Sequence, residues 1–206
     1  MLEGQKKLSP LLIVTILLAL YLIIRFICTQ WLDSLGGYTS YYFELLLVTT
    51  AITLLWSKFK TMFTLPKALY LVISLSLICG YLVFKGAAAL QITAPFDMTN
   101  IELKFFLLLV APNLEELIFR FFCWQPFEKI NKNFALITTS LLFSYSHFHS
   151  YWFVPPEYHG FVFYQTAYTL LLGFACGYSL WKYNSLLGAI LIHFTFNLGF
   201  FLGSLF

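Results

Sequence analysis

The residues in this sequence that are best suited to chemistry lie in one short stretch, Pro112 to Arg120. The stretch places two adjacent carboxylates, Glu115 and Glu116, and one guanidinium inside a run that is otherwise almost wholly apolar. Ionisable side chains at membrane depth cost roughly 2.5 to 3.5 kcal/mol each on insertion, so they are rare and face a protein interior or a wet cavity. Three of them together indicate either a buried structural ion pair or a functional site.

The spacing of these residues separates the roles of the two glutamates. Glu116 and Arg120 are four residues apart, so on a helix they share a face, with the acid in the order that favours an ion pair. Glu115 is offset from Glu116 by about 100° around the helix axis and has no cation in that register. We therefore expect Glu116 to support Arg120, and Glu115 to be the candidate general base. The alternative is an ion pair that only joins two helices.

Two further polar clusters lie in later apolar stretches. His147 stands near the end of one of them, and His149 would point about 200° away from it on a continuous helix. His193 and Asn197 are four residues apart, so an imidazole and a carboxamide would share one helix face and could hold an oxyanion. Taken alone, each cluster is at least as consistent with hydrogen bonds that join transmembrane helices.

Together the three clusters make up a hydrolytic set of side chains. A carboxylate and an imidazole can activate water, while a second imidazole and an amide can stabilise a tetrahedral oxyanion. The sequence has no serine or cysteine in a recognisable nucleophile setting. These residue types therefore favour direct attack by water over an acyl-enzyme.

The same three clusters resemble the motifs of a known family. Glu115-Glu116-x-x-x-Arg120, Phe143-x-x-x-His147 and His193-x-x-x-Asn197, in this order on late apolar segments, are similar to those of the CAAX protease and bacteriocin-processing (CPBP) family of intramembrane endopeptidases. That family includes the type II CAAX prenyl endopeptidases. The resemblance covers roughly residues 100 to 206, and the earlier segments resemble nothing specific.

The resemblance implies an all-helical membrane protease with defined residue roles. The roles fall on three pairs: Glu115 with His147 to activate water, His193 with Asn197 as the oxyanion hole, and Glu116 with Arg120 in support. Family members often have a glycine after the arginine, where this chain has Phe121. That departure affects packing rather than chemistry.

The same side chains raise the question of a metal. Two histidines and a glutamate are a familiar zinc ligand set. The sequence has no His-Glu-x-x-His motif, however, and the two histidines lie on different segments, with an asparagine in place of a third strong ligand. We therefore predict that no cofactor is needed, with zinc as the alternative.

Composition places these motifs in a membrane protein. Of the 206 residues, 60% are hydrophobic and 10% charged, and the mean hydropathy is +0.82. Soluble domains carry about 25% charged residues, so this chain falls in the membrane class. The net charge is only +3 and the basic residues are scattered, which argues against nucleic acid as a partner. The four cysteines are far apart, and we expect small buried hydrophobic side chains rather than disulfides or metal ligands.

Seven apolar segments define the predicted fold, an all-α polytopic bundle of about seven transmembrane helices. Each segment is near the length that crosses about 30 Å of hydrocarbon. We predict a single membrane domain over residues 1–206, in which residues 1–100 hold N-terminal helices of unassigned role and residues 101–206 form the catalytic core. The segments are 10–31, 41–57, 67–85, 103–124, 133–150, 161–181 and 185–204.

Loop charges predict one orientation of this bundle. By the positive-inside rule, the N-terminus is cytoplasmic and, with seven spans, the C-terminus is outside. Arg25 and Glu44 lie within early segments but near their ends, where we expect both side chains to reach the interface. The lysines that share the cytoplasmic side are Lys6, Lys7, Lys58, Lys60, Lys67, Lys129, Lys132 and Lys182.

Two functions from different classes remain open from the sequence. The first is hydrolysis of a peptide bond in a peptide or protein substrate, in or at the lipid bilayer. The second is a non-proteolytic membrane partner that uses the same fold, such as a bacteriocin immunity protein or a regulator of a sensor kinase. A carrier is disfavoured because the sequence shows no internal repeat. Residue usage suggests a bacterial source and, with it, a multi-pass protein of the cell membrane.

Overall fold

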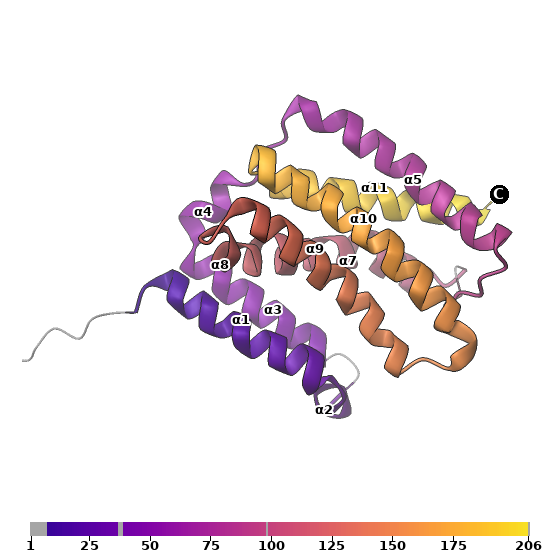
Figure 1. Ribbon diagram of the computed structural model, residues 1–206, viewed down its shortest axis with the longest axis horizontal. Helices are drawn as coiled ribbons and strands as arrows, with labels where there is room; N and C mark the ends of the chain where they lie inside the picture. The colour runs from indigo at the N-terminus through magenta and orange to yellow at the C-terminus, as the bar shows by residue number, and fades with distance from the viewer. Residues whose placement is uncertain (1–7, 37–38, 98, 206) are drawn as a thin grey trace, which may run out of the picture.

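A computed structural model describes residues 8–36, 39–97 and 99–205 of the chain. Every regular element in these ranges is a helix, and the helices lie side by side in one bundle (Figure 1). The all-helical class predicted from the sequence is therefore confirmed. Lys6 and Lys7, which contribute to the predicted orientation, lie outside the described residues.

The helices follow one another with short connections. Two of the short elements, η2 and η3, are π-helices, and η1, η4 and η5 are 3₁₀ turns. In chain order the elements are α1 Pro10–Ile27, α2 Thr29–Ser34, α3 Thr39–Leu54, α4 Trp56–Thr61, η1 Lys67–Leu69, α5 Tyr70–Ala89, α6 Ile101–Phe105, η2 Phe106–Val110, α7 Ala111–Glu116, η3 Leu117–Phe122, α8 Trp124–Glu128, α9 Lys132–Phe148, η4 His149–Trp152, η5 Pro156–Tyr158, α10 His159–Tyr183 and α11 Leu186–Leu205.

The seven predicted apolar segments all fall on helical structure. Within the described residues, three helices are long and apolar enough to cross a membrane: Pro10–Ile27, Lys67–Ala89 and Leu186–Leu205. Of the remaining segments, α3 has 16 residues, α9 has 17 and α10 has 25, and 103–124 falls on the run α6 to α8. The structure thus shows an all-helical protein with three candidate spans, and the arrangement of seven crossing helices stays a prediction.

Local sequence signals explain where several helices begin and end. The Ser9 side chain accepts a hydrogen bond from the first turn of α1, and Pro10 occupies the first helical position, where a missing N–H costs nothing. Asn100 and Asn131 cap the starts of α6 and α9 in the same way. Asn184 ends α10 in the left-handed conformation with φ of 50°, which asparagine tolerates better than most residues.

Helices α5 and α11 approach each other backbone to backbone, and they run alongside one another in Figure 1. A Cβ atom added at Gly80 would lie 1.9 Å from the carbonyl oxygen of Phe196, and one at Gly199 would lie 1.9 Å from that of Leu77. Small residues at such crossings let membrane helices gain dispersion contacts that larger side chains would prevent. The two glycines therefore set the position of α11, which carries His193 and Asn197.

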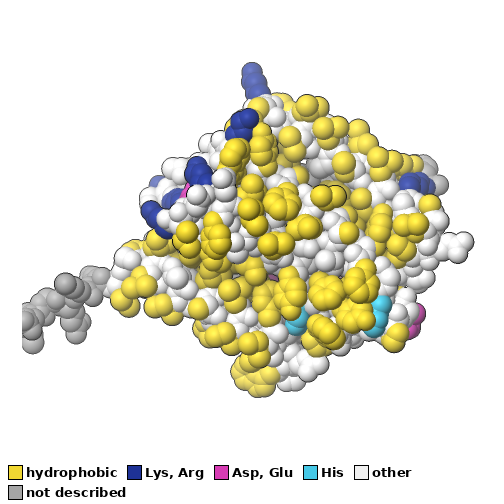
Figure 2. Space-filling view, viewed as in Figure 1, with side chains coloured by type: hydrophobic (Ala, Val, Ile, Leu, Met, Phe, Trp, Pro, Cys, Tyr) yellow, Lys and Arg dark blue, Asp and Glu magenta, His cyan; other side chains and the backbone are white. Residues whose placement is uncertain are grey.

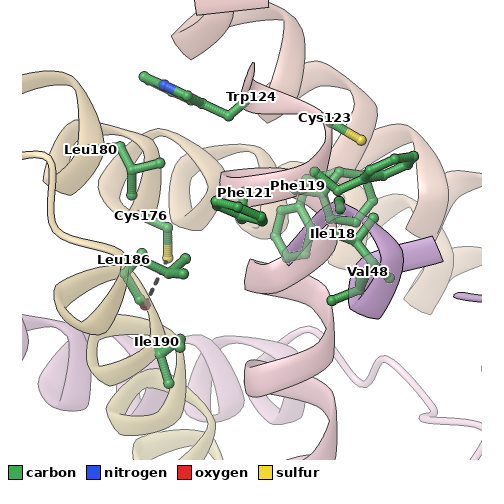
Figure 3. Close-up of a cluster of buried hydrophobic side chains, with 14 of the residues drawn as sticks. Val48, Ile118, Phe119, Phe121, Cys123, Trp124, Cys176, Leu180, Leu186 and Ile190 are labelled. Carbon is green, nitrogen blue, oxygen red and sulfur yellow. Dashed lines mark hydrogen bonds between the residues drawn. The ribbon is translucent and has the colours of Figure 1, made fainter. Parts of the chain in front are cut away.

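The hydrophobic core lies around the π-helix η3, next to the charged residues of the first motif. Phe121, Phe122 and Trp124 are fully buried or nearly so. Figure 3 shows how side chains from α3, α10 and α11 close around this segment. The residues labelled there are Val48, Ile118, Phe119, Phe121, Cys123, Trp124, Cys176, Leu180, Leu186 and Ile190.

Hydrophobic side chains also cover much of the outer surface. Figure 2 shows them over most of one face, with lysine and arginine side chains toward its edges. Leu12, Leu46, Leu71 and Leu171 are examples of large apolar residues that are at least 45% exposed. A surface of this kind fits the lipid environment of a membrane protein, as composition predicts.

Ion pairs gather at one end of the bundle. Lys58 lies 2.5 Å from a carboxylate oxygen of Glu128, and Lys132 lies 3.9 Å from the other oxygen. Nearby, the indole of Trp181 donates to Asn133 at 2.7 Å. These contacts bring α4, α8, α9 and α10 together at the end that the loop charges assign to the cytoplasm.

The four cysteines are all free, as expected from their spacing. Cys123 and Cys176 are buried, which agrees with the prediction of small buried side chains. Cys79 is exposed and Cys28 is half-buried, so the prediction of burial is wrong for Cys79. The neighbouring Gly80 faces α11, so Cys79 is turned toward the outside of α5.

Candidate active site

A fully buried ion pair forms the base of the site. Glu116 Oε2 lies 3.2 Å from Arg120 Nε, and neither side chain is exposed. The guanidinium also donates to the Thr139 hydroxyl at 2.7 Å and to the Gly173 carbonyl at 2.9 Å. A buried pair persists only when further hydrogen bonds satisfy its polar atoms. Arg120 thereby ties η3 to α9 and α10, and its pairing with Glu116 confirms the contact that the spacing of four residues predicted.

His193 joins this pair from α11. Its Nδ1 lies 2.9 Å from Glu116 Oε1, and its Nε2 lies 3.8 Å from Glu115 Oε2. Because an ionised carboxylate can only accept, Nδ1 carries the proton in the bond to Glu116. The opposite edge of the ring faces Glu115. The imidazole therefore lies between the two adjacent glutamates, which the sequence motifs alone did not specify.

Glu115 differs from its neighbour in exposure and in partners. Its side chain is 28% exposed, whereas that of Glu116 is 0% exposed. The Oε2 atom of Glu115 is buried and finds no hydrogen-bond partner among the described residues. One glutamate is thus held in the protein interior by Arg120, and the other is left available to a ligand or to water.

His147 is oriented by its own helix. Its Nδ1 lies 2.9 Å from the carbonyl oxygen of Phe143, one turn earlier in α9. A carbonyl can only accept, so Nδ1 donates, and the lone pair of the neutral ring is on Nε2. The Phe143 ring packs edge-on against both His147 and His193, at centroid distances of 4.8 and 5.6 Å. Phe143 thereby fixes the orientation of two imidazoles from different helices.

Asn197 binds a carbonyl that the π-helix η2 leaves free. The Ala111 N–H donates to the carbonyl of Phe106, five residues back. In the same pattern the carbonyl of Leu107 would accept from the nitrogen of Pro112, which has no hydrogen. The carbonyl of Leu107 instead accepts from Asn197 Nδ2 at 2.8 Å. Pro112 therefore widens the helix rather than breaking it, and the freed carbonyl positions Asn197.

All four predicted catalytic residues line one cavity of about 80 Å³, which has room for a few water molecules. They come from α7, α9 and α11. The rest of the wall is mainly aromatic and aliphatic, with Lys104 as a cation. Besides Glu115, His147, His193 and Asn197, the lining residues are Phe96, Lys104, Leu107, Leu108, Ala111, Gln165, Tyr168, Thr169, Leu172, Phe196, Phe200 and Phe201.

A second cavity of about 250 Å³ lies against the same catalytic residues. Ala111, Glu115, His147 and Gln165 line both cavities. The remaining lining is contributed largely by the N-terminal helices and η3. These residues are Tyr21, Arg25, Tyr41, Glu44, Phe106, Leu114, Ile118, Phe119, Ser146 and Ser150.

Arg25 and Glu44 do not behave as the sequence suggested. The expectation that each reaches the membrane interface separately is wrong, because Arg25 Nε lies 3.5 Å from Glu44 Oε1 and the two side chains are only 29% and 11% exposed. The Tyr21 hydroxyl lies 3.5 Å from the same oxygen. The two charges meet between α1 and α3 because their helices run antiparallel, a relationship that local spacing cannot reveal.

Other polar residues lie outside this arrangement. His149 does not line either cavity, and its Nε2 lies 3.2 Å from the carbonyl oxygen of Phe26. This agrees with the expectation that His147 and His149 point to different places. No group of three or more His, Cys, Asp or Glu side chains within the described ranges is placed to share a metal ion.

Several residues that line the two cavities belong to none of the three sequence motifs. Arg25 and Glu44 could have been found from the general rule that ionisable residues inside membrane segments are functional by default. Gln165 and Tyr168 of α10 also line the main cavity. Neither has a distinctive spacing relative to the three motifs, so no sequence signal identifies them.

Comparison with known families agrees with the motifs. The chain matches the family model of the type II CAAX prenyl endopeptidase Rce1-like proteins over residues 99–199. Neither a curated protein nor a solved structure matches it. The matched range contains all three motifs, whereas α1 to α5 lie before it. This is a family of membrane proteases, which supports a hydrolase that acts on a peptide or protein. The family resemblance predicted from the three motifs is therefore confirmed, and it is to the Rce1-like type II CAAX prenyl endopeptidases.

Proposed function

We propose that this protein is an intramembrane endopeptidase that hydrolyses a peptide bond with an activated water molecule and without a metal. One observation carries the proposal. Glu115, His147, His193 and Asn197 come from three helices that are distant in sequence, and they line one small cavity. A cavity that holds a few waters beside an unpaired carboxylate and an imidazole is suited to general base catalysis.

The first step of the proposed reaction is activation of water. Glu115 takes a proton from the water as its oxygen attacks the carbonyl carbon of the scissile bond. His147 presents the lone pair of Nε2 to the same water, because its Nδ1–H is bound to Phe143. The carbon becomes tetrahedral and its oxygen becomes an oxyanion. When the C–N bond breaks, Glu115 returns the proton to the leaving nitrogen.

His193 and Asn197 stabilise the oxyanion in this scheme. Asn197 uses one of its two amide hydrogens on Leu107, so the second is available to the substrate. His193 can donate from Nε2 to the oxyanion when its ring carries both protons, with its Nδ1–H bound to Glu116. Glu116 and Arg120 act through His193 by holding its Nδ1 edge, and they do not touch the substrate.

The test is cleavage by purified protein reconstituted in liposomes. We expect Glu115→Gln and His147→Ala each to lower kcat by roughly 10² to 10⁴-fold, while thermal unfolding shows that the fold is retained. Loss of activity through misfolding is separated from loss of chemistry by this second measurement. If the Glu115→Gln protein cleaves at the wild-type rate, the proposal is wrong. If the biological effect of the protein survives in this variant, a binding role is favoured instead.

We also propose that all seven segments cross the membrane with the N-terminus in the cytoplasm, in the cell membrane of a bacterium. In support, Lys58, Glu128 and Lys132 form one ion-pair cluster at the end that also carries Lys129. His147 lies in the last turn of α9, which begins at Lys132, so it is near the opposite end. In this orientation the active site is closer to the outer face, and its substrate arrives from that side.

A further inference from the structure

The second cavity is lined partly by residues that precede the family match, namely Tyr21, Arg25, Tyr41 and Glu44. An endopeptidase must hold the substrate chain on both sides of the cleaved bond. The main cavity and the second cavity adjoin at Glu115 and His147, which line both, so each provides space next to the catalytic residues. The second cavity is the larger, at about 250 Å³ against about 80 Å³.

The two cavities differ in chemistry. Phe96, Phe196, Phe200 and Phe201 make the main cavity aromatic, so it suits apolar side chains. Hydroxyls and charges dominate the wall of the second cavity outside η3. Besides the shared Glu115, His147 and Gln165, the polar groups there are those of Tyr21, Arg25, Tyr41, Glu44, Ser146 and Ser150.

Buried polar atoms in the second cavity are poorly satisfied. Arg25 Nε and Glu115 Oε2 are both buried and have no hydrogen-bond partner among the described residues. Arg25 Nε also lies 3.5 Å from Glu44 Oε1, within ion-pair distance. A buried polar atom without a partner is costly, so these atoms favour an occupant that brings hydrogen bonds.

A purely structural role explains the ion pair of Arg25 with Glu44 less well. Buried ion pairs contribute little net stability, because desolvation offsets their attraction, and apolar replacements are often neutral or stabilising. The ionisable residues of α1 and α3 are instead placed beside the catalytic Glu115 and His147. Charges at membrane depth that face a cavity are typical of substrate pathways.

We propose that the second cavity binds the hydrophilic half of the substrate peptide, with Arg25 and Glu44 as its specificity-determining residues. The apolar half of the same peptide lies in the aromatic cavity. The substrate class is thus an amphiphilic peptide whose scissile bond separates an apolar stretch from a stretch of polar side chains. This inference rests on the proposed endopeptidase function and adds the substrate class and the role of α1 and α3.

The experiment uses two sets of short internally quenched peptides and the reconstituted full chain. Both sets share a Leu- and Phe-rich half, and the other half is rich in Ser, Asn and Gln in one set and in Leu and Ala in the other. We expect the wild type to favour the polar set at least tenfold in kcat/KM. In the double variant Arg25→Met with Glu44→Leu, the preference should fall below twofold through a higher KM for the polar set, with kcat kept.

A matched control distinguishes binding from stability. Lys58→Met removes an interhelical ion pair at the opposite end of the bundle, and it should leave the preference unchanged. The inference is overturned if the Met/Leu variant keeps the tenfold preference.

Cross-linking separates this inference from the proposed function. In Glu115→Gln protein, a photoreactive group in the polar half of an uncleaved peptide should label residues of α1 or α3, within 10–54. Labelling confined to residues that line only the main cavity, such as Leu108, Phe200 and Phe201, contradicts the inference even if cleavage occurs. Failure of the wild type to cleave either peptide set contradicts the endopeptidase function instead.

Discussion

The imidazole of His193 donates from Nδ1 to the fully buried carboxylate of Glu116 at 2.9 Å. The same carboxylate lies 3.2 Å from Arg120 Nε, so a cation, an anion and an imidazole form one chain across η3 and α11. Glu115, one residue earlier, contacts only the opposite edge of the ring. The two adjacent glutamates therefore differ in burial and in partners, and we propose a structural role for Glu116 and a chemical one for Glu115.

The first prediction concerns the different roles proposed for Glu115 and Glu116. Glu116→Gln removes one partner of a buried pair and should destabilise the protein by about 3 to 5 kcal/mol, because Arg120 is left uncompensated. Glu115→Gln should change stability by less than about 1 kcal/mol, since it breaks no close pair. Chemical unfolding of both variants in detergent measures the difference. Equal losses of stability would show that the two glutamates are not distinct in this way.

The second prediction concerns the support of Arg120. A Cβ atom at Gly173 would lie 3.3 Å from Arg120 Nη2 and 3.2 Å from the Phe143 ring, so both groups must shift. We expect Gly173→Ala to lower kcat by roughly tenfold, because small displacements of catalytic groups are costly. Gly160→Ala in the same helix is the control, as its Cβ meets nothing within 4 Å. Similar kinetics for the two variants would contradict the role of Gly173.

The third prediction concerns the π-helix before the glutamates. Pro112→Ala restores a backbone N–H that can pair with a carbonyl one turn earlier and so competes with the wide π turn. We expect Asn197 to lose its fixed position on Leu107 and kcat to fall up to about 10²-fold, with the fold retained. Kinetics and unfolding of the variant are measured together. Unchanged kcat would show that the π turn does not position Asn197.

The fourth prediction concerns metal. Because we propose activation of water by Glu115 and His147, activity should be unchanged by EDTA or phenanthroline. Elemental analysis of active purified protein should find less than one zinc per ten chains. Stoichiometric zinc that is required for cleavage would overturn the metal-free mechanism and favour the alternative ligand set of two histidines and a glutamate.

The fifth prediction concerns orientation. Glu157 and Lys129 are both exposed, and they lie in connections at opposite ends of the predicted spans. In intact cells, an impermeant maleimide should label Glu157→Cys from outside, whereas Lys129→Cys should react only after permeabilisation. The buried Cys123 and Cys176 should stay unreactive in the native protein. The reverse labelling pattern would reverse the orientation.

The sequence was most informative where a feature is local. Apolar length predicted the helices, and the spacing of four residues predicted the contact of Glu116 with Arg120, because both depend on helix geometry alone. The likeness of motifs placed His193 in the site. Its bond to Glu116 depends on how closely α11 approaches α7, which the glycines of the α5–α11 crossing set from a distance.

Features that join distant elements could not be predicted. The partner of Asn197 is a backbone carbonyl, and every residue has one, so nothing in the side-chain sequence marks Leu107. Arg25 and Glu44 are nineteen residues apart on different helices, and their contact depends on how α1 packs against α3. Each looked like an isolated charge near a helix end for that reason.

The two cavities share Glu115 and His147, but α1 and α3 line only the second one. In the proposed arrangement, residues 99–199 hold the catalytic residues and most of the aromatic cavity, and α1 and α3 contribute Arg25 and Glu44 to recognition of the polar half of the substrate. Catalysis and recognition of the polar half of the substrate are then encoded in different stretches of the gene. A lineage could exchange its first two long helices and acquire a new target peptide without rebuilding the catalytic machinery. The same exchange, made in the laboratory, offers a route to a membrane protease of chosen selectivity.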